Sequence, residues 1–81
     1  MAQLPLPNQR RFGEWEVCDK GNMTNNSKGF EISHDRLKES EWWAFFYTEP
    51  NFNWNEFIPA YFYACKQAKI EKLNLNLNLL L

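Results

Sequence analysis

Ser33, His34 and Asp35 are the first residues to test for chemistry, because a hydroxyl, an imidazole and a carboxylate together form the relay of a serine hydrolase. That relay needs the three side chains to meet in space. Adjacent side chains of a strand point to opposite faces, so consecutive residues do not generally form it. We therefore interpret the triplet as a turn at the end of a strand, with Ser33 or Asp35 capping the local backbone.

Metal and thiol chemistry find equally little support in the sequence. His34 is the only histidine, and no pair of potential ligands has the spacing of a zinc site. Cys65 falls on the apolar stripe of a predicted helix, where a cysteine acts as a small buried hydrophobe. Cys18 precedes Asp19, whose negative charge disfavours a reactive thiolate. We expect no catalytic residue, no metal and no cofactor, and hence a protein that is not an enzyme.

The strongest signal is a concentration of aromatic side chains in the middle of the chain. The sequence contains 4 Trp, 3 Tyr and 7 Phe. Eleven of them lie in one stretch: Trp42, Trp43, Phe45, Phe46, Tyr47, Phe52, Trp54, Phe57, Tyr61, Phe62 and Tyr63. A chain of 9.7 kDa has enough surface to bury on folding to hide every ring. The number of rings alone therefore does not indicate a binding surface.

Crowding of the rings at 42–47 is the better indication of binding. So short a segment cannot turn every ring toward one small ribbon and one helix, and some rings should stay accessible. Tyr63 falls almost opposite Trp54 on the following helix and is expected to face outward. Exposed Trp and Tyr side chains are typical of partner-binding surfaces. The predicted partner-binding residues are Trp42, Trp43, Phe45, Tyr47, Tyr63, Glu39, Glu41 and Glu49.

The charge pattern indicates which partner such a surface would choose. Net charge is −1, so no overall field attracts nucleic acid or anionic lipid. Residues 31–56 are acidic, with only Arg36 and Lys38 as cations, whereas the region after Phe57 is rich in lysine. Glutamates beside exposed rings favour a basic protein partner.

Single-stranded nucleic acid is the alternative partner, because bases stack on aromatic rings that are interleaved with basic side chains. Here the interleaved charges are mostly glutamates. Arg10, Arg11 and the lysines beyond Tyr63 would supply a basic patch only if folding brings them over the rings.

We therefore expect a small regulator, inhibitor or adaptor that docks an acidic-rimmed aromatic patch onto a larger protein or onto a second copy of itself. The competing interpretation assigns no function: the rings form an aromatic core, and one or two of them are exposed by chance.

The N-terminal residues lack the basic start and continuous apolar run of a signal peptide. No apolar run approaches the ~20 residues of a membrane span. The expected location is cytoplasmic, without a membrane partner.

The elements that must position these residues are short. Alternation from Phe12 to Cys18 predicts a half-buried strand with Trp15 and Val17 inward. A polar turn region follows, and Phe30 alternating with its neighbours predicts a second strand at about 29–33. The two strands would form an antiparallel ribbon that needs a helix, or a third strand, over its apolar face.

Residues 41–48 fit two structures. Their run of aromatic residues suits a buried third strand. Ser40 as an N-cap, Glu41 in the first turn and Pro50 after the end favour a short helix, which is the interpretation we adopt.

Residues from Trp54 to about Ile70 show the period of an amphipathic helix, with Asn53 or Asn55 as the cap and Pro59 near its start. The predicted fold is thus a single small α+β domain over 11–72. A flexible arm at 1–10 precedes it, and a tail at 73–81, in which Leu alternates with Asn, follows it.

Overall fold

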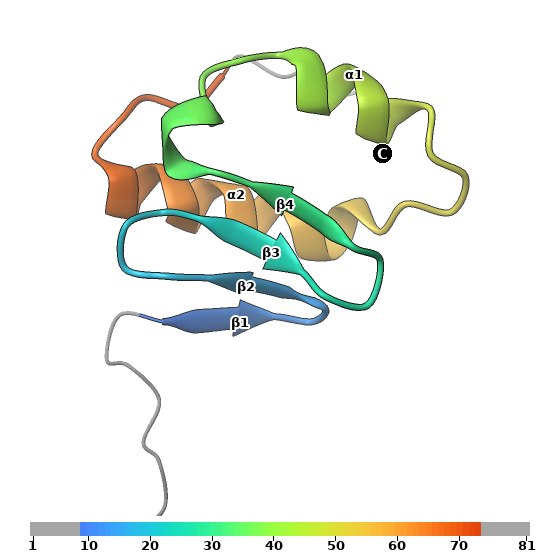
Figure 1. The fold of residues 1–81 in the computed structure, drawn as a ribbon, viewed down its shortest axis with the longest axis horizontal. Helices are drawn as coiled ribbons and strands as arrows, with labels where there is room; N and C mark the ends of the chain where they lie inside the picture. Colours follow the sequence, from blue (N-terminus) through green and yellow to red (C-terminus); the bar gives the residue numbers. More distant parts are fainter. Residues whose placement is uncertain (1–8, 74–81) are drawn as a thin grey trace, which may run out of the picture.

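Four strands form an antiparallel meander in the computed structural model, which describes residues 9–73. The strands are β1 (Arg10–Phe12), β2 (Trp15–Val17), β3 (Met23–Asn25) and β4 (Phe30–Ile32). Their order in the sheet is β1-β2-β3-β4 (Figure 1). Phe12 pairs with Trp15, Val17 with Met23, and Asn25 with Phe30.

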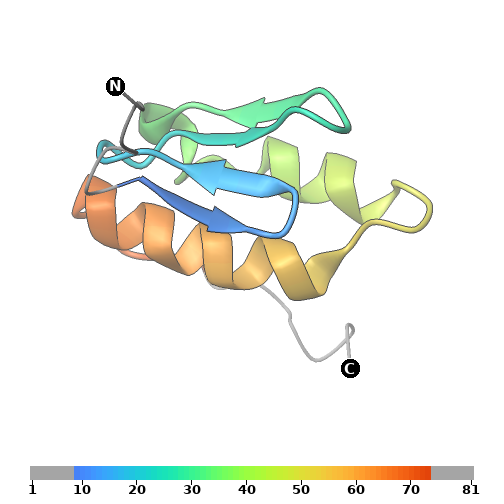
Figure 2. The same ribbon diagram turned by 90° about the horizontal axis from the view of Figure 1, so that it is seen from below.

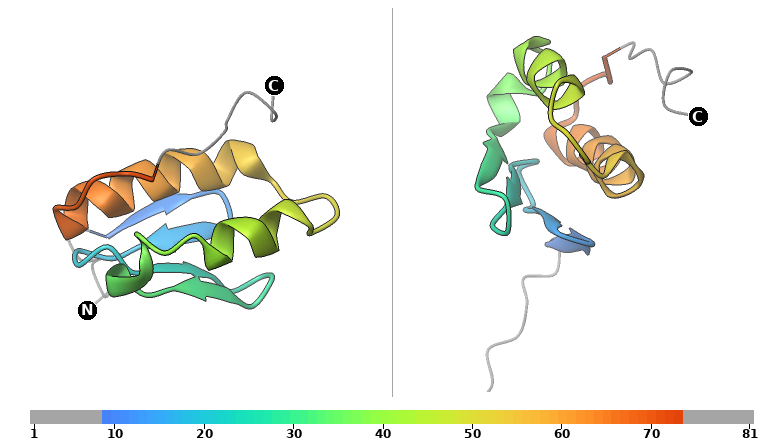
Figure 3. Two further views of the ribbon diagram at one scale, coloured as in Figure 1. Left: turned by 90° about the horizontal axis from the view of Figure 1, so that it is seen from above. Right: turned by 90° about the vertical axis from the view of Figure 1, so that its right-hand side faces the viewer.

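Three helical segments follow the sheet: the 3-10 turn η1 (His34–Arg36), α1 (Glu41–Tyr47) and α2 (Trp54–Ala68). α2 packs against β1, β2 and β3, and it runs beside these strands in Figure 2. α1 lies next to α2, on the β4 side of the molecule (Figure 3). The predicted α+β class is therefore confirmed.

The sheet has more strands than the two that we predicted. Gly13, at φ +62°, turns the chain after Phe12, so the predicted strand from Phe12 to Cys18 is divided between β1 and β2. The predicted turn region contains β3, which pairs with both of its neighbours. The predicted two-stranded ribbon is thus part of a larger meander, and residues 41–47 form a helix rather than a third strand.

α2 begins and ends at recognisable caps. The Asn53 side chain accepts a hydrogen bond from the Glu56 N–H at 3.3 Å, as predicted for an N-cap. Lys69 adopts the left-handed conformation at φ 60°, and its N–H donates to the carbonyls of Cys65 and Lys66 in the last turn of the helix. Pro59 lies in the second turn and donates no hydrogen bond to the carbonyl of Asn55.

The core lies between the sheet and α2. Its fully buried side chains include Trp15, Val17 and Met23 from the sheet and Phe57 and Tyr61 from α2. The Trp15 ring lies 5.2 Å from that of Phe57, edge to face, an arrangement that aromatic pairs prefer. Of the predicted arm and tail, the structure describes only residues 9, 10 and 73.

Candidate protein-binding surface

α1 is the helix that carries most of the predicted binding residues, and Phe46 is its one buried residue. The Phe46 ring stacks on Phe52 with centroids 4.6 Å apart and packs against Phe57 at 5.4 Å. Successive residues of a helix are rotated by about 100°, so Phe45 and Tyr47 point to opposite sides of Phe46. The rings of α1 are therefore divided among several surfaces instead of forming one patch.

Trp42 is turned mainly toward the core, although we predicted it as a binding anchor. Its ring centroid lies 5.3 Å from Phe57 and 5.0 Å from Tyr61. Its indole Nε1 donates a hydrogen bond to the Arg36 carbonyl at 3.1 Å. Trp42 thus fastens α1 to α2 and to η1, and only part of the ring is left at the surface.

Trp43 and Tyr47 lie on the side of α1 that faces α2. Their rings are 5.3 Å apart, and Trp43 is 5.1 Å from Trp54, in both cases edge to face. Tyr47 is 45% exposed, whereas Trp43 and Trp54 are half-buried. We call these three residues the α1–α2 ring cluster. The two tryptophans hold Tyr47 in place while leaving it accessible.

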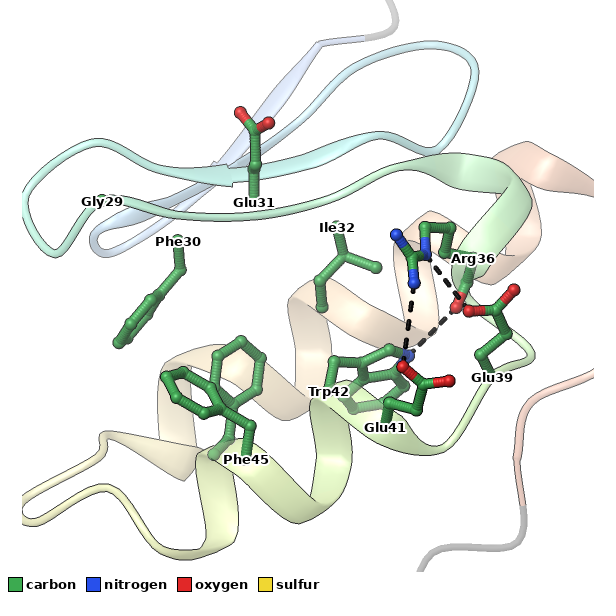
Figure 4. Close-up of a pocket in the computed structure, with 10 residues that line it drawn as sticks. Gly29, Phe30, Glu31, Ile32, Arg36, Glu39, Glu41, Trp42 and Phe45 are labelled. Carbon is green, nitrogen blue, oxygen red and sulfur yellow. Dashed lines mark hydrogen bonds and ion pairs between the residues drawn. The ribbon is translucent and has the colours of Figure 1, made fainter.

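Phe45 lies on the opposite side of α1 and is 53% exposed. It stands beside a groove of about 640 Å³ between β4 and α1 (Figure 4). Phe30 meets Phe45 edge to face at 5.9 Å, and Ile32 and Trp42 line the groove further along. We call this hollow the β4–α1 groove.

Charged side chains surround one end of the β4–α1 groove. The Arg36 Nε lies 3.1 Å from Glu39 Oε1, and its Nη2 lies 3.8 Å from Glu41 Oε2 (Figure 4). All three side chains are exposed, so these ion pairs contribute little to stability. Two carboxylates facing one guanidinium leave this end of the groove with a net negative charge. Glu31 points away from the groove, to the other face of the sheet (Figure 4).

Glu49 is separate from this rim. It follows α1, and its N–H donates to the Phe46 carbonyl at 3.1 Å. Its half-buried side chain borders a smaller hollow next to Asn51 and Asn53. Of the three predicted acidic residues, the structure thus brings Glu39 and Glu41 together and places Glu49 elsewhere.

Tyr63 is not turned outward as we expected from the helix pattern. It is half-buried on the β1 side of α2, where its ring lies 5.7 Å from Phe12. The Arg10 guanidinium carbon is 5.5 Å from the Tyr63 ring. β1, which we did not predict as a separate strand, covers this face of α2. Phe62 is the ring of α2 that is exposed, at 38%, with the Lys72 ammonium 4.4 Å from its centroid.

The Ser33, His34 and Asp35 triplet forms the strand-end turn predicted for it. His34 Nδ1 is 2.9 Å from Asn22 Oδ1, so its ring is engaged outside the triplet. A hydrogen bond from Ser33 lowers the pKa of the exposed Asp35 carboxyl.

Cys65 is buried and Cys18 half-buried, and both are free thiols. Burial raises the pKa of the Cys65 thiol, which makes it a poor nucleophile at neutral pH.

Sequence reasoning did not assign Phe30, Ile32 or Arg36 to a binding surface, although all three line the groove. Phe30 and Ile32 were predicted only as alternating residues of a strand, and Arg36 only as an exception to an acidic region. Phe30 borders the groove because β4 is the last strand in the order of the described sheet. The sequence alone did not predict that order, so it did not indicate that Phe30 lies beside α1.

Within residues 9–73, no group of three His, Cys, Asp or Glu side chains could hold a metal ion. No helix in the same range is long and apolar enough to cross a membrane. Comparison of the chain with known protein families, with curated proteins and with solved structures gave no match.

Proposed function

We propose that this chain is a small non-enzymatic regulatory or adaptor protein that binds a larger protein partner through the exposed rings of α1. The observation that supports the proposal is the low burial of this aromatic helix. Its sequence is Glu-Trp-Trp-Ala-Phe-Phe-Tyr, yet it buries only Phe46 and leaves Phe45 and Tyr47 about half exposed. Exposed aromatic side chains of this kind are enriched among the residues that dominate binding energies.

Tyr47 is the better anchor of the two exposed rings. It is supported by Trp43 at 5.3 Å and by Trp54 at 6.3 Å. A side chain that is already held in place loses little conformational entropy when a partner covers it. Binding at the α1–α2 ring cluster would therefore gain apolar contact at a low ordering cost.

The carboxylates of Glu39 and Glu41 favour a partner whose docking surface is basic. Arg36 offsets only part of their charge. Charges at the rim of an interface act mainly on the rate of association and on its salt dependence. Changing both glutamates to glutamine should thus slow association at low salt and leave the dissociation rate nearly unchanged.

Affinity purification of the full chain from its native cells, followed by mass spectrometry, identifies the partner. Tyr47→Ala should then lose at least tenfold in affinity for it, with a change in unfolding free energy within about 0.5–1 kcal/mol. Phe62→Ala is the matched control, since it removes an exposed ring of α2 that does not belong to the α1–α2 ring cluster. The proposal is wrong if Phe62→Ala weakens binding as much as Tyr47→Ala does.

Single-stranded nucleic acid is a second candidate ligand, and a specific observation favours it. Folding brings the Arg10 guanidinium within 5.5 Å of the Phe12 and Tyr63 rings, which places a basic group over aromatic rings as such a surface needs. Both rings are half-buried, however, and offer little free face for stacking.

Fluorescence anisotropy with a labelled single-stranded oligonucleotide tests this candidate. Binding should weaken steeply as the salt concentration rises from about 50 to about 200 mM, and Arg10→Ala should reduce the salt slope by about 0.7 for each phosphate that the arginine neutralises. Absence of binding at low salt excludes this ligand and leaves the protein partner as the proposal.

A further inference from the structure

The two edges of the described sheet differ in how they are protected. β1 carries Arg10 and Arg11, and charged side chains on an edge strand discourage pairing with another strand. α2 also packs against β1. β4 has a neighbouring strand on one side only within residues 9–73. Its one charged residue, Glu31, points to the face opposite α1 (Figure 4).

The free edge of β4 opens onto the β4–α1 groove. Phe30 and Ile32 point toward α1, and Phe45 and Trp42 line the groove from α1 (Figure 4). A strand added to β4 would place every second side chain on this helix-facing side, in the groove. The side chains in between would lie on the solvent face beside Glu31. The site therefore suits an extended segment that is apolar at alternate residues and polar between them.

The chain itself contains one segment with this pattern. Residues 73–79 read Leu-Asn-Leu-Asn-Leu-Asn-Leu, so a strand here would carry leucine on one face and asparagine on the other. No side chain from 73 to 81 is charged, so its insertion buries no charged side chain and meets no repulsion from the glutamates at the groove. We propose that residues 75–79 of a second copy of this chain add to the free edge of β4 as a fifth strand, with their leucines in the β4–α1 groove.

A second copy is the donor because the groove and the start of the tail lie on different sides of α1. The Leu73 N–H donates to the Tyr61 hydroxyl at 2.9 Å, and that hydroxyl donates to the Leu37 carbonyl at 3.1 Å. These bonds hold the segment after α2 on the side of α1 remote from β4 (Figure 3).

Insertion into the same molecule would first have to carry the chain past α1. A path halfway round a helix about 10 Å across is about 16 Å long, which takes up about five residues at ~3.3 Å each. Residues 75–79 begin only two positions after Leu73, so they do not reach the groove of their own molecule. In a two-fold exchange the whole tail of each copy is available to the groove of the other, and the two contacts form together.

Sedimentation equilibrium of the full chain tests the exchange. At tens of micromolar the protein should have twice its chain mass of 9.7 kDa. The double variant Leu75→Asn and Leu77→Asn should return to the mass of one chain. The matched control, Asn74→Ser with Asn76→Ser, changes the other face of the same tail and should remain dimeric. A monomeric wild type, or a dimer in the leucine variant, overturns the proposal.

A mixing experiment distinguishes tail exchange from any symmetrical contact. Phe45→Glu blocks the groove and should be monomeric alone, as should the leucine variant. An equimolar mixture contains one intact tail and one intact groove, so it should form a heterodimer. If the mixture stays monomeric while both variants keep the wild-type circular dichroism, the copies do not associate through the tail. Phe45→Ala repeats this arm with a smaller change.

The dimer and the proposed partner binding can fail independently. Tyr47→Ala changes the α1–α2 ring cluster and should leave the dimer intact, whereas the leucine variant leaves that cluster unchanged. Loss of the dimer in Tyr47→Ala would show that the copies meet through the rings and would overturn the tail exchange.

Discussion

Replacing Tyr61 by phenylalanine removes a single oxygen atom from the middle of the molecule. That hydroxyl donates to the Leu37 carbonyl at 3.1 Å and accepts from the Leu73 N–H at 2.9 Å. Tyr61 and Leu37 are both fully buried, so water does not replace the missing bond to the carbonyl. The aromatic ring stays in place, and the change therefore creates no large cavity.

Two hydrogen bonds at about 0.5–1.5 kcal/mol each give an expected loss of about 1–3 kcal/mol in the free energy of unfolding. In a domain of this size, a loss of about 2 kcal/mol lowers Tm by roughly 8–16 °C. Thermal and urea unfolding followed by circular dichroism measure both quantities. Tyr47→Phe is the control, because it removes the same hydroxyl group from a side chain that is 45% exposed. It should change the free energy of unfolding by less than about 0.5 kcal/mol. Equal effects of the two changes would refute the reasoning.

The same hydroxyl predicts a pH dependence. Burial raises the pKa of Tyr61 above its ordinary value of 10.0. Above pH 10 the unfolded chain therefore loses this proton while the folded chain keeps it, so stability falls as the pH rises. Tyr61→Phe lacks this proton, and its stability should fall less steeply than that of the wild type between about pH 10 and about pH 11. Parallel curves would show that the hydroxyl is not buried as described.

Three further experiments test the packing of the core. Gly21→Ala should cost about 1–3 kcal/mol more than Gly29→Ala, since both have positive φ but only a Cβ at Gly21 meets the backbone of α2, and urea unfolding measures the difference. Cys65 should react with a thiol reagent more than about 1,000-fold more slowly than Cys18, because its exposure requires opening of the core; similar rates would contradict its burial. Phe46→Ala should lower stability by about 3–5 kcal/mol in the same unfolding assay, and a loss below about 1 kcal/mol would show that this ring is not core.

The helices could be predicted because their signals are local. α2 repeats its apolar residues with the helical period over 15 residues, and Asn53 supplies its cap within the same stretch. The strands were harder, since each has only three residues. β3 has a polar composition, Met-Thr-Asn, and the buried Asn25 is compensated by a bond from the Lys28 N–H at 2.9 Å to its side chain. No alternation rule finds a strand of that kind.

The site could be predicted only as a region. The excess of rings in α1 is visible in the sequence, but which ring is inside depends on elements far away in the chain. Trp42 is turned inward because Tyr61 and Phe57 of α2 lie beside it. Tyr63 is half-buried because β1 covers it. Both outcomes depend on tertiary contacts that one sequence does not specify locally.

The three-residue strands have a consequence for how the chain reaches its fold. Such strands are marginal without apolar cover, and the cover for Trp15 and Val17 is α2, the last of the described elements. Strands made first during synthesis therefore have nothing to pack on until Trp54–Ala68 has been made. The sheet and the helix should form together in one late cooperative step, limited by the search that joins the two ends of the domain.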